Sequence, residues 1–200
     1  MGLWEIEDSL YAKGCAAVCG IDEAGRGPLA GPVCAAACIL PQDLQIEGLN
    51  DSKKLSAKKR EALYDVITEQ AIAWAVCLID EARIDEINIL QATFEAMRGA
   101  VGKLSVLPDY CLVDGNRDPG LGLPTLTVVK GDAKCATVAA ASILAKVTRD
   151  RLMVEYDGQY PGYGFAVHKG YGTKAHYAAI DKLGLCPIHR RTFLKSYGNR

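Results

Sequence analysis

Two apolar runs and the loop between them decide the fold of this chain. They lie within residues 15–40, which read CAAVCGIDEAGRGPLAGPVCAAACIL. The first run covers residues 15–21 and the second covers residues 31–40, and the loop that joins them is rich in glycine and proline. Two apolar runs joined in this way favour an antiparallel hairpin. The sequence therefore predicts a sheet built on this hairpin.

Predicted helices and strands alternate along the rest of the chain. We expect further strands over residues 71–79, 110–113 and 126–129, and helices over residues 56–70, 81–103, 133–156 and 173–183. The alanine-rich helix over 133–156 is apolar on most sides, which predicts burial against the sheet. The expected fold is α/β, a mixed sheet flanked by helices over residues 1–156 with a small basic helical region over residues 157–200.

The charge of the chain is distributed unevenly. Its formal net charge of −1 by itself argues against a nucleic-acid partner. However, residues 1–129 contain 11 Lys and Arg against 19 Asp and Glu, whereas residues 130–200 contain 12 against 5. This asymmetry predicts an acidic site beside a basic surface.

Cysteine usage and hydropathy indicate the class of protein. The chain of 200 residues has eight cysteines but no C-x-x-C, and its three histidines have no zinc-ligand spacing with any cysteine. We therefore expect reduced, structural thiols. The sequence shows neither an apolar run of about 18 residues nor a signal peptide, which predicts a soluble cytoplasmic protein with no membrane contact.

Four carboxylates stand near the ends of predicted strands. Asp22, Asp114 and Asp132 each fall at or just after a strand end, where sites assemble in α/β sheets, and Glu23 adds a fourth acid. Carboxylates that converge in this way repel one another unless a cation is present. Two Mg²⁺ or Mn²⁺ ions would neutralise them and would clamp the oxygens of a phosphodiester. Taken singly, each acid also fits a helix cap or a solvated strand end.

Gly25-Arg26-Gly27 follows the first two acids directly. The glycine spacing is G-x-G-x-x-x-G, one residue too long for the dinucleotide fingerprint. Glycines on both sides of an arginine allow the backbone to approach a ligand closely. A plain turn between two strands fits the spacing equally well.

Six ordered blocks of the sequence together suggest a family. They are residues 20–33 (GIDEAGRGPLAGPV), 50–55 (NDSKKL), 113–115 (VDG), 130–132 (KGD), 142–150 (SILAKVTRD) and 168–171 (HKGY). This set resembles the signature of type 2 ribonucleases H, in particular bacterial ribonuclease HII, and it covers nearly the whole chain.

The resemblance implies a ribonuclease H-like fold and an endonuclease. Such an enzyme cuts the RNA strand of RNA/DNA hybrids and nicks duplex DNA 5′ to an embedded ribonucleotide. The residues that it implies are the metal ligands Asp22, Glu23, Asp114 and Asp132, the Gly25-Arg26-Gly27 element and a junction-sensing Tyr171. With two metal ions, hydrolysis would leave 5′-phosphate and 3′-hydroxyl ends.

Hydrogen bonding to the 2′-hydroxyl distinguishes RNA from DNA, because only that group differs between the two sugars. The backbone at Gly25 to Gly27 can reach it, while Arg26 adds a donor for phosphate. Tyr171 can bond the same hydroxyl and stack on the next sugar, which would favour deoxyribose on the 3′ side. The alternative for Tyr171 is packing among the C-terminal helices.

Further polar residues are candidates for contact with the nucleic-acid backbone. We assign Lys53, Ser142 and Lys146 to this role as a hypothesis, since Ser142 and Lys146 share one stripe of a helix with Arg149. For Arg149, an internal ion pair with an acid such as Asp150 is an equal alternative.

Aromatic and histidine residues beyond residue 156 are open to more than one interpretation. His168 fits a proton shuttle or, more commonly, a phosphate-binding or surface residue. Tyr160, Tyr163 and Phe165 favour packing between the two regions over a platform for stacking bases.

Two other functions compete with the nuclease. A non-catalytic hybrid-binding module is disfavoured, since it would gain nothing from four acids that face phosphates. A junction resolvase would cut substrates that contain only deoxyribonucleotides.

We expect a monomer without an obligate protein partner; residues 191–200 show no obvious clamp-binding peptide. Tight nucleic-acid binding should depend on divalent metal as well as on salt.

Overall fold

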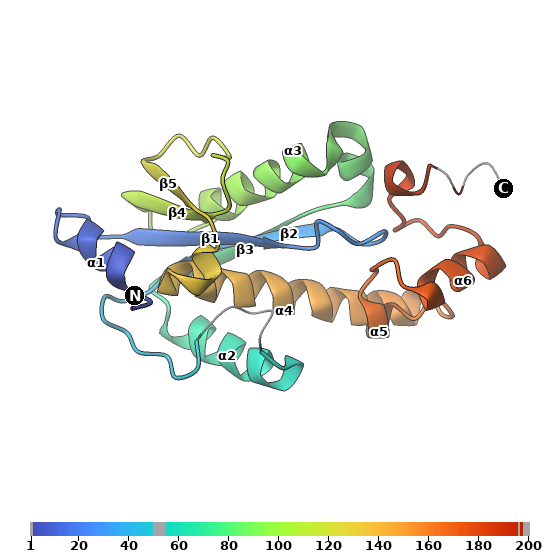
Figure 1. Ribbon diagram of the computed structural model, residues 1–200, viewed down its shortest axis with the longest axis horizontal. Helices are drawn as coiled ribbons and strands as arrows, with labels where there is room; N and C mark the ends of the chain where they lie inside the picture. The colour runs from blue at the N-terminus through green and yellow to red at the C-terminus, as the bar shows by residue number, and fades with distance from the viewer. Residues whose placement is uncertain (1, 50–54, 196, 198–200) are drawn as a thin grey trace.

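One five-stranded sheet forms the centre of the protein (Figure 1). The structure is a computed structural model that describes residues 2–49, 55–195 and 197. The strand order is β3-β2-β1-β4-β5. The strands are β1 (Val18–Ala24), β2 (Val33–Ile39), β3 (Ala73–Ile79), β4 (Tyr110–Asp114) and β5 (Thr125–Val128). β2 pairs antiparallel with β1 and β3, whereas β4 pairs parallel with β1 and β5, which confirms the hairpin and the mixed sheet.

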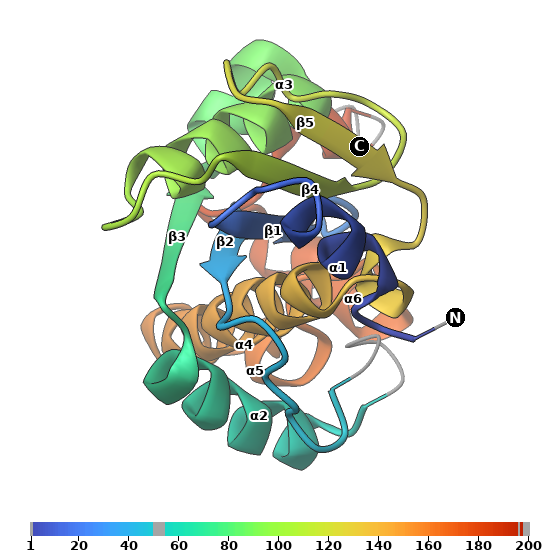
Figure 2. The same ribbon diagram turned by 90° about the vertical axis from the view of Figure 1, so that its left-hand side faces the viewer.

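Helices cover both faces of the sheet, as Figures 1 and 2 show. One face carries α3 (Glu81–Gly102), and the other carries α4 (Ala136–Gln159) with α2 (Ala57–Gln70) packed outside it. The remaining helices are α1 (Glu5–Tyr11), α5 (Phe165–His168) and α6 (Lys174–Leu183), and there are short 3₁₀ turns η2 (Gly131–Ala133) and η3 (Arg191–Leu194). None of the helices in the described part of the chain has the length and apolar character needed to cross a membrane.

Successive side chains of β1 point to opposite faces of the sheet, so they pack in two different places. Cys19 and Ile21 are buried in the cluster formed with α3. Gly20 faces α4, and a Cβ there would lie 2.0 Å from the carbonyl carbon of Thr137. The helix therefore packs directly on the strand, which explains why its buried face is built of alanines.

The first strand is displaced along the sequence from its predicted position. We expected residues 15–21, but β1 runs from Val18 to Ala24 and so includes both acids. The partners of Asp22 and Glu23 on β2 are Ala36 and Ala35, and these small side chains leave room for the carboxylates within the ladder. The pairing of β1 with β2 thus continues through two charged residues, although the hydropathy pattern predicted that the strand would end before them.

The start of α4 and the presence of α1 also differ from expectation. The predicted helix over 133–156 is preceded by the η2 turn and begins at Ala136. The α1 helix was not predicted at all. Its buried Glu7 accepts hydrogen bonds from the Thr137 amide at 3.0 Å and hydroxyl at 2.9 Å, so the side chain caps the first turn of α4.

Beyond α4, the C-terminal segments build a separate apolar cluster at one end of the sheet (Figure 1). Phe165 is fully buried there, Tyr163 stacks on it with ring centroids 5.2 Å apart, and Tyr160 packs at the edge. This confirms the packing role predicted for these aromatics. All eight cysteines are free thiols, as expected.

Candidate active site

Three of the four candidate carboxylates surround one cavity of about 210 Å³. Its other lining residues come from the loop after β1, from α4 and from the turn before α6. The full lining is Asp22, Glu23, Ala24, Gly25, Arg26, Gly27, Asp114, Ser142, Lys146 and Tyr171. The fold therefore brings together nine of the eleven candidates. Of the other two, Asp132 does not line this cavity and Lys53 lies outside the described residues.

The sheet register explains how acids far apart in the sequence meet. β1 and β4 are parallel and pair Ile21 with Val113, so the next residues, Asp22 and Asp114, lie at the same level on the same face. Glu23 alternates to the face covered by α3. The carboxylates consequently approach the cavity from both faces of the sheet.

Asp22 is the most deeply buried acid of the cavity, with 3% of its surface exposed. Burial raises its pKa well above the ordinary value, and the charges of Glu23 and Asp114 raise it further. Hydrogen bonds from the Ser142 side chain and from the Glu23 amide, the latter at 2.7 Å, act in the opposite direction. Burial and the two neighbouring carboxylates thus disfavour the charged form of Asp22.

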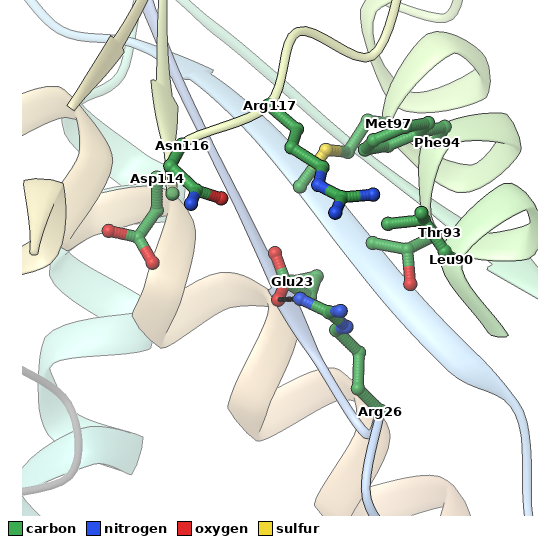
Figure 3. Close-up of a pocket in the computed structure, with 10 residues that line it drawn as sticks. Glu23, Arg26, Leu90, Thr93, Phe94, Met97, Asp114, Asn116 and Arg117 are labelled. Carbon is green, nitrogen blue, oxygen red and sulfur yellow. Dashed lines mark hydrogen bonds and ion pairs between the residues drawn. The ribbon is translucent and has the colours of Figure 1, made fainter. Parts of the chain in front are cut away.

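The other acids have protein partners. A Glu23 carboxylate oxygen lies 3.3 Å from an Arg26 guanidinium nitrogen (Figure 3). Asp114 accepts a hydrogen bond of 2.6 Å from the amide of Gly131. Asp132 is in the η2 turn next to Gly131 and is 3% exposed. Within residues 2–49, 55–195 and 197, no three His, Cys, Asp or Glu side chains stand close enough together to hold a metal ion as they are placed.

Two buried arginines fix the conformation of the Gly25-Arg26-Gly27 loop. Arg190 donates to the carbonyl oxygens of Gly25 at 2.6 Å, Arg26 at 3.0 Å and Gly31 at 2.7 Å. Gly25 has a φ of +92°, and a Cβ there would lie 2.1 Å from Nε of Arg149. The glycine at 25 is therefore required by packing against an arginine of the protein itself.

Arg149 contradicts both interpretations drawn from its position in the sequence. It donates to the carbonyl oxygens of Pro32 at 2.8 Å, Ala30 at 2.9 Å and Lys169 at 3.0 Å. Within the described residues it forms no ion pair, and its 1% exposure keeps it from a nucleic-acid backbone. Arg190 was not among the predicted site residues, because nothing local in the sequence shows which carbonyl groups a buried arginine will bond.

The α4 candidates lie in the cavity wall with internal partners. Ser142 is 4% exposed and hydrogen bonds with Asp22. The Lys146 ammonium forms a 2.7 Å ion pair with Asp150, and burial lowers its pKa. Tyr171 is 44% exposed, and its ring edge lies 3.7 Å from where a Cβ on Gly27 would stand. Tyr171 therefore stands over the glycine loop and is accessible from outside.

His168 also departs from expectation. Its Nε2 lies 2.8 Å from the Tyr163 carbonyl oxygen, and its Nδ1 accepts a 3.2 Å hydrogen bond from the Gly170 amide. Both ring nitrogens are engaged by backbone, which leaves neither for a proton shuttle or for a phosphate.

A second cavity of about 380 Å³ adjoins the first through Glu23, Arg26 and Asp114. Figure 3 shows Asn116 and Arg117 on its rim, opposite apolar side chains of α3. Neither of these two polar side chains has a hydrogen-bond partner among the described residues. Asn116 and Arg117 were not among the predicted site residues, although they directly follow Asp114-Gly115 at the end of β4.

Comparison with known proteins assigns the family. The family model described as Ribonuclease HII matches residues 19–196. The chain is 59% identical over 191 residues to a ribonuclease HII of Geobacter metallireducens. The aligned region covers 96% of this chain and 90% of that protein. A ribonuclease H2 structure from Pyrococcus horikoshii aligns with a TM-score of 0.77 and 30% identity, covering 92% of this chain and 96% of that one.

A structure of ribonuclease HII from Archaeoglobus fulgidus, in complex with PCNA, aligns with a TM-score of 0.76 at 26% identity, covering 88% of this chain and 94% of that one. Sequence and fold thus agree over nearly the whole chain. The chain belongs to the ribonuclease HII family and is a metal-dependent ribonuclease H, a hydrolase of the RNA strand in RNA/DNA hybrids.

Proposed function

We propose that this enzyme also nicks duplex DNA 5′ to an embedded ribonucleotide and leaves 5′-phosphate and 3′-hydroxyl ends. The observation that carries the proposal is the shared cavity, where acids for phosphodiester hydrolysis lie beside the glycine loop and Tyr171. A site that both cleaves phosphate esters and reads a 2′-hydroxyl needs these two sets of groups together. A pure hybrid-binding module would not need the acids.

Asp22, Glu23, Asp114 and Asp132 are the proposed ligands of two Mg²⁺ or Mn²⁺ ions. Their all-oxygen chemistry suits hard divalent cations, and such cations would offset the burial and the neighbouring carboxylate charges that raise the pKa of Asp22. When bound, the ions would supply an activated water and stabilisation of the leaving 3′-oxygen. To bind a metal ion, the Glu23 carboxylate must exchange its ion pair with Arg26 for the ion.

The remaining groups bind and orient the sugar. Arg190 occupies the carbonyls of Gly25 and Arg26, whereas the amides of Arg26 and Gly27 have no internal acceptor within the described residues. Those N–H groups are the proposed donors to the 2′-hydroxyl oxygen. Arg26 is the proposed phosphate contact, as are Lys53, Ser142 and Lys146 along the strand.

A duplex with one ribonucleotide tests the proposal. With Mg²⁺ or Mn²⁺ we expect a single nick 5′ to that nucleotide, and EDTA should abolish it. The same duplex with deoxyribose at that position should stay intact. Cutting of the all-deoxyribose duplex would favour a junction-resolvase type of activity, and an uncut ribonucleotide duplex in the presence of metal would disprove the proposal.

Tyr171→Phe tests the proposed sugar contact. We expect cleavage at a single ribonucleotide to fall about fivefold, the equivalent of one hydrogen bond, because only the hydroxyl is lost. Mn²⁺ binding measured by calorimetry should not change. Tyr177→Phe, which also removes a hydroxyl from a C-terminal aromatic ring, is the matched control. Equal cleavage rates for wild type and Tyr171→Phe would show that the hydroxyl has no such role.

The setting of the enzyme follows from the same proposal. Eight free thiols support a reducing compartment, the cytoplasm, and we propose that the protein acts there as a monomer on nucleic acid. The proposed parts are a catalytic one over residues 1–156 and a C-terminal region over residues 157–200, and the apolar cluster around Phe165 packs the second against Leu29, Ala30 and Met153 of the first.

A further inference from the structure

Three histidine side chains pack together next to the turn that contains Tyr171. They are the only histidines of the chain. The His168 ring stacks on His176 with centroids 4.4 Å apart and an interplanar angle of 18°. Nε2 of His176 lies 3.1 Å from Nε2 of His189, and both of these residues are buried. Because buried ring nitrogens need partners, the contacts of each ring determine which nitrogen carries its proton.

A directed chain of hydrogen bonds runs through two of these rings to Tyr171. The Cys186 amide donates to Nδ1 of His189 at 2.9 Å, so neutral His189 carries its proton on Nε2. That proton points at Nε2 of His176, which must accept it. His176 then carries its own proton on Nδ1, which lies 3.0 Å from the carbonyl oxygen of Tyr171 and donates to it.

The third histidine fixes the other side of Tyr171. His168 accepts from the Gly170 amide through Nδ1, and its Nε2 donates to the Tyr163 carbonyl oxygen. The turn between them has positive φ at Lys169 (52°) and at Gly170 (83°). A non-glycine residue in this region is strained and needs outside contacts to hold it. Histidines therefore bond to backbone on both sides of the Tyr171 α-carbon.

We propose that His176, oriented by His189 and stacked on His168, is a positioning residue that fixes Tyr171 over the glycine loop and so sets selectivity for a ribonucleotide at an RNA–DNA junction. The inference rests on the proposed function, in which Tyr171 contacts the 2′-hydroxyl. None of the three histidines lines the catalytic cavity. Their effect on the reaction passes through the backbone of Tyr171.

The chain of hydrogen bonds requires neutral rings. A second proton on Nε2 of His176 would face the N–H of His189. A second proton on Nδ1 of His189 would face the amide N–H of Cys186. Burial, together with a smaller effect of the neighbouring histidines, lowers the pKa of both residues, that of His189 to about 4. The other groups that face the rings are the uncharged Cys186 thiol and the rings of Tyr163 and Phe165. We therefore expect the chain to be intact at pH 7.

Nitrogen-15 NMR spectra of the imidazoles test the chain without any activity measurement. At pH 7 we expect the proton of His176 on Nδ1 and those of His168 and His189 on Nε2. The Cys186 carbonyl oxygen, 3.3 Å from Nδ1 of His189, would favour the opposite tautomer for that ring. A His176 proton on Nε2 would overturn the proposal.

Two substitutions of His176 separate positioning from packing. Asparagine places an amide N–H where Nδ1 is and can still donate to the Tyr171 carbonyl. Glutamine places its polar group where Nε2 is and loses that bond. The readout is the ratio of kcat/KM on a duplex with one ribonucleotide to kcat/KM on a long RNA/DNA hybrid. Thermal unfolding of both variants shows whether stability differs.

We expect His176→Asn to keep the wild-type ratio within about twofold and His176→Gln to lower it about fivefold, as for loss of one hydrogen bond. Equal ratios for the two variants would overturn the positioning role. Tyr171→Phe, measured alongside, separates a failure of the proposed tyrosine contact from a failure of the proposed role of His176. An unchanged ratio in that variant would overturn the tyrosine contact and the inference together. An unchanged ratio in His176→Gln alone would overturn only the inference.

Discussion

Replacing Asp22 with asparagine should abolish cleavage and at the same time raise the temperature of unfolding in the absence of metal. Metal ions contribute several kcal/mol of transition-state stabilisation, so loss of a proposed central ligand should lower kcat/KM by about 1,000-fold or more. Stability should rise because Asp22 is a buried charge next to Glu23 and Asp114. Asparagine keeps the shape and removes the repulsion.

The stability gain should depend on pH. The folded protein binds the Asp22 proton more tightly than the unfolded chain does, because the pKa in the folded state is raised above 3.8. As the pH falls through that raised value, wild-type Asp22 becomes protonated and the repulsion disappears. The difference in unfolding temperature between Asp22→Asn and wild type should therefore be large at pH 8 and shrink toward pH 4.

Asp181→Asn is the matched control for this experiment. It removes the same charge from an exposed position on α6, away from the cavity. Its activity and unfolding temperature should stay close to wild type. An Asp22→Asn protein that retains activity, or that is less stable than wild type at pH 8, would contradict the account of the carboxylate cluster.

Arg190→Met should cause the largest loss of stability. The guanidinium is fully buried and supplies the donors for three backbone carbonyls at residues 25, 26 and 31. Each buried acceptor left without a donor costs about 1–3 kcal/mol, so the total is about 3 kcal/mol or more. For a chain of this size that corresponds to a fall in unfolding temperature of about 6–12 °C.

The activity of Arg190→Met should fall as well, because the Gly25-Arg26-Gly27 loop loses its anchor in the C-terminal region. Arg191→Met is the control, since the neighbouring side chain is exposed. Arg190→Lys should be intermediate, because a compact ammonium keeps the charge but lacks the planar fork of donors with which the guanidinium reaches all three carbonyls. If Arg190→Met unfolds within about 1 °C of wild type, the anchoring role is wrong.

The extent to which the fold was predictable differs between elements. The hairpin of β1 and β2 and the helices α2, α3 and α6 followed from local patterns of apolar residues and caps, such as Ser56 at the start of α2. The α1 helix did not, because seven residues with three acids have little helical stability of their own. Its stability depends on Glu7, which bonds to Thr137 far along the chain.

The candidate site shows a similar division. The sequence predicted that Asp22 and Asp114 would lie close together, and the parallel pairing of β1 and β4 does bring them to one level, although Asp22 lies within β1 and not at its end. The roles of Arg149 and Arg190 were not predictable, since their acceptors are carbonyls that the sequence does not mark. The histidine cluster escaped prediction for the same reason, as its three members meet only through the packing of α5, α6 and the segment around His189.

The most direct measurement of the central claim is a crystal structure of Asp22→Asn with Mg²⁺ and a duplex that contains one ribonucleotide. The account predicts the 2′-hydroxyl within hydrogen-bond distance of the Arg26 or Gly27 amide and of the Tyr171 hydroxyl. It also predicts the phosphate on the 5′ side of that nucleotide against the remaining carboxylates. A ribonucleotide bound with its 2′-hydroxyl away from this loop, or a different phosphate at the acids, would contradict it.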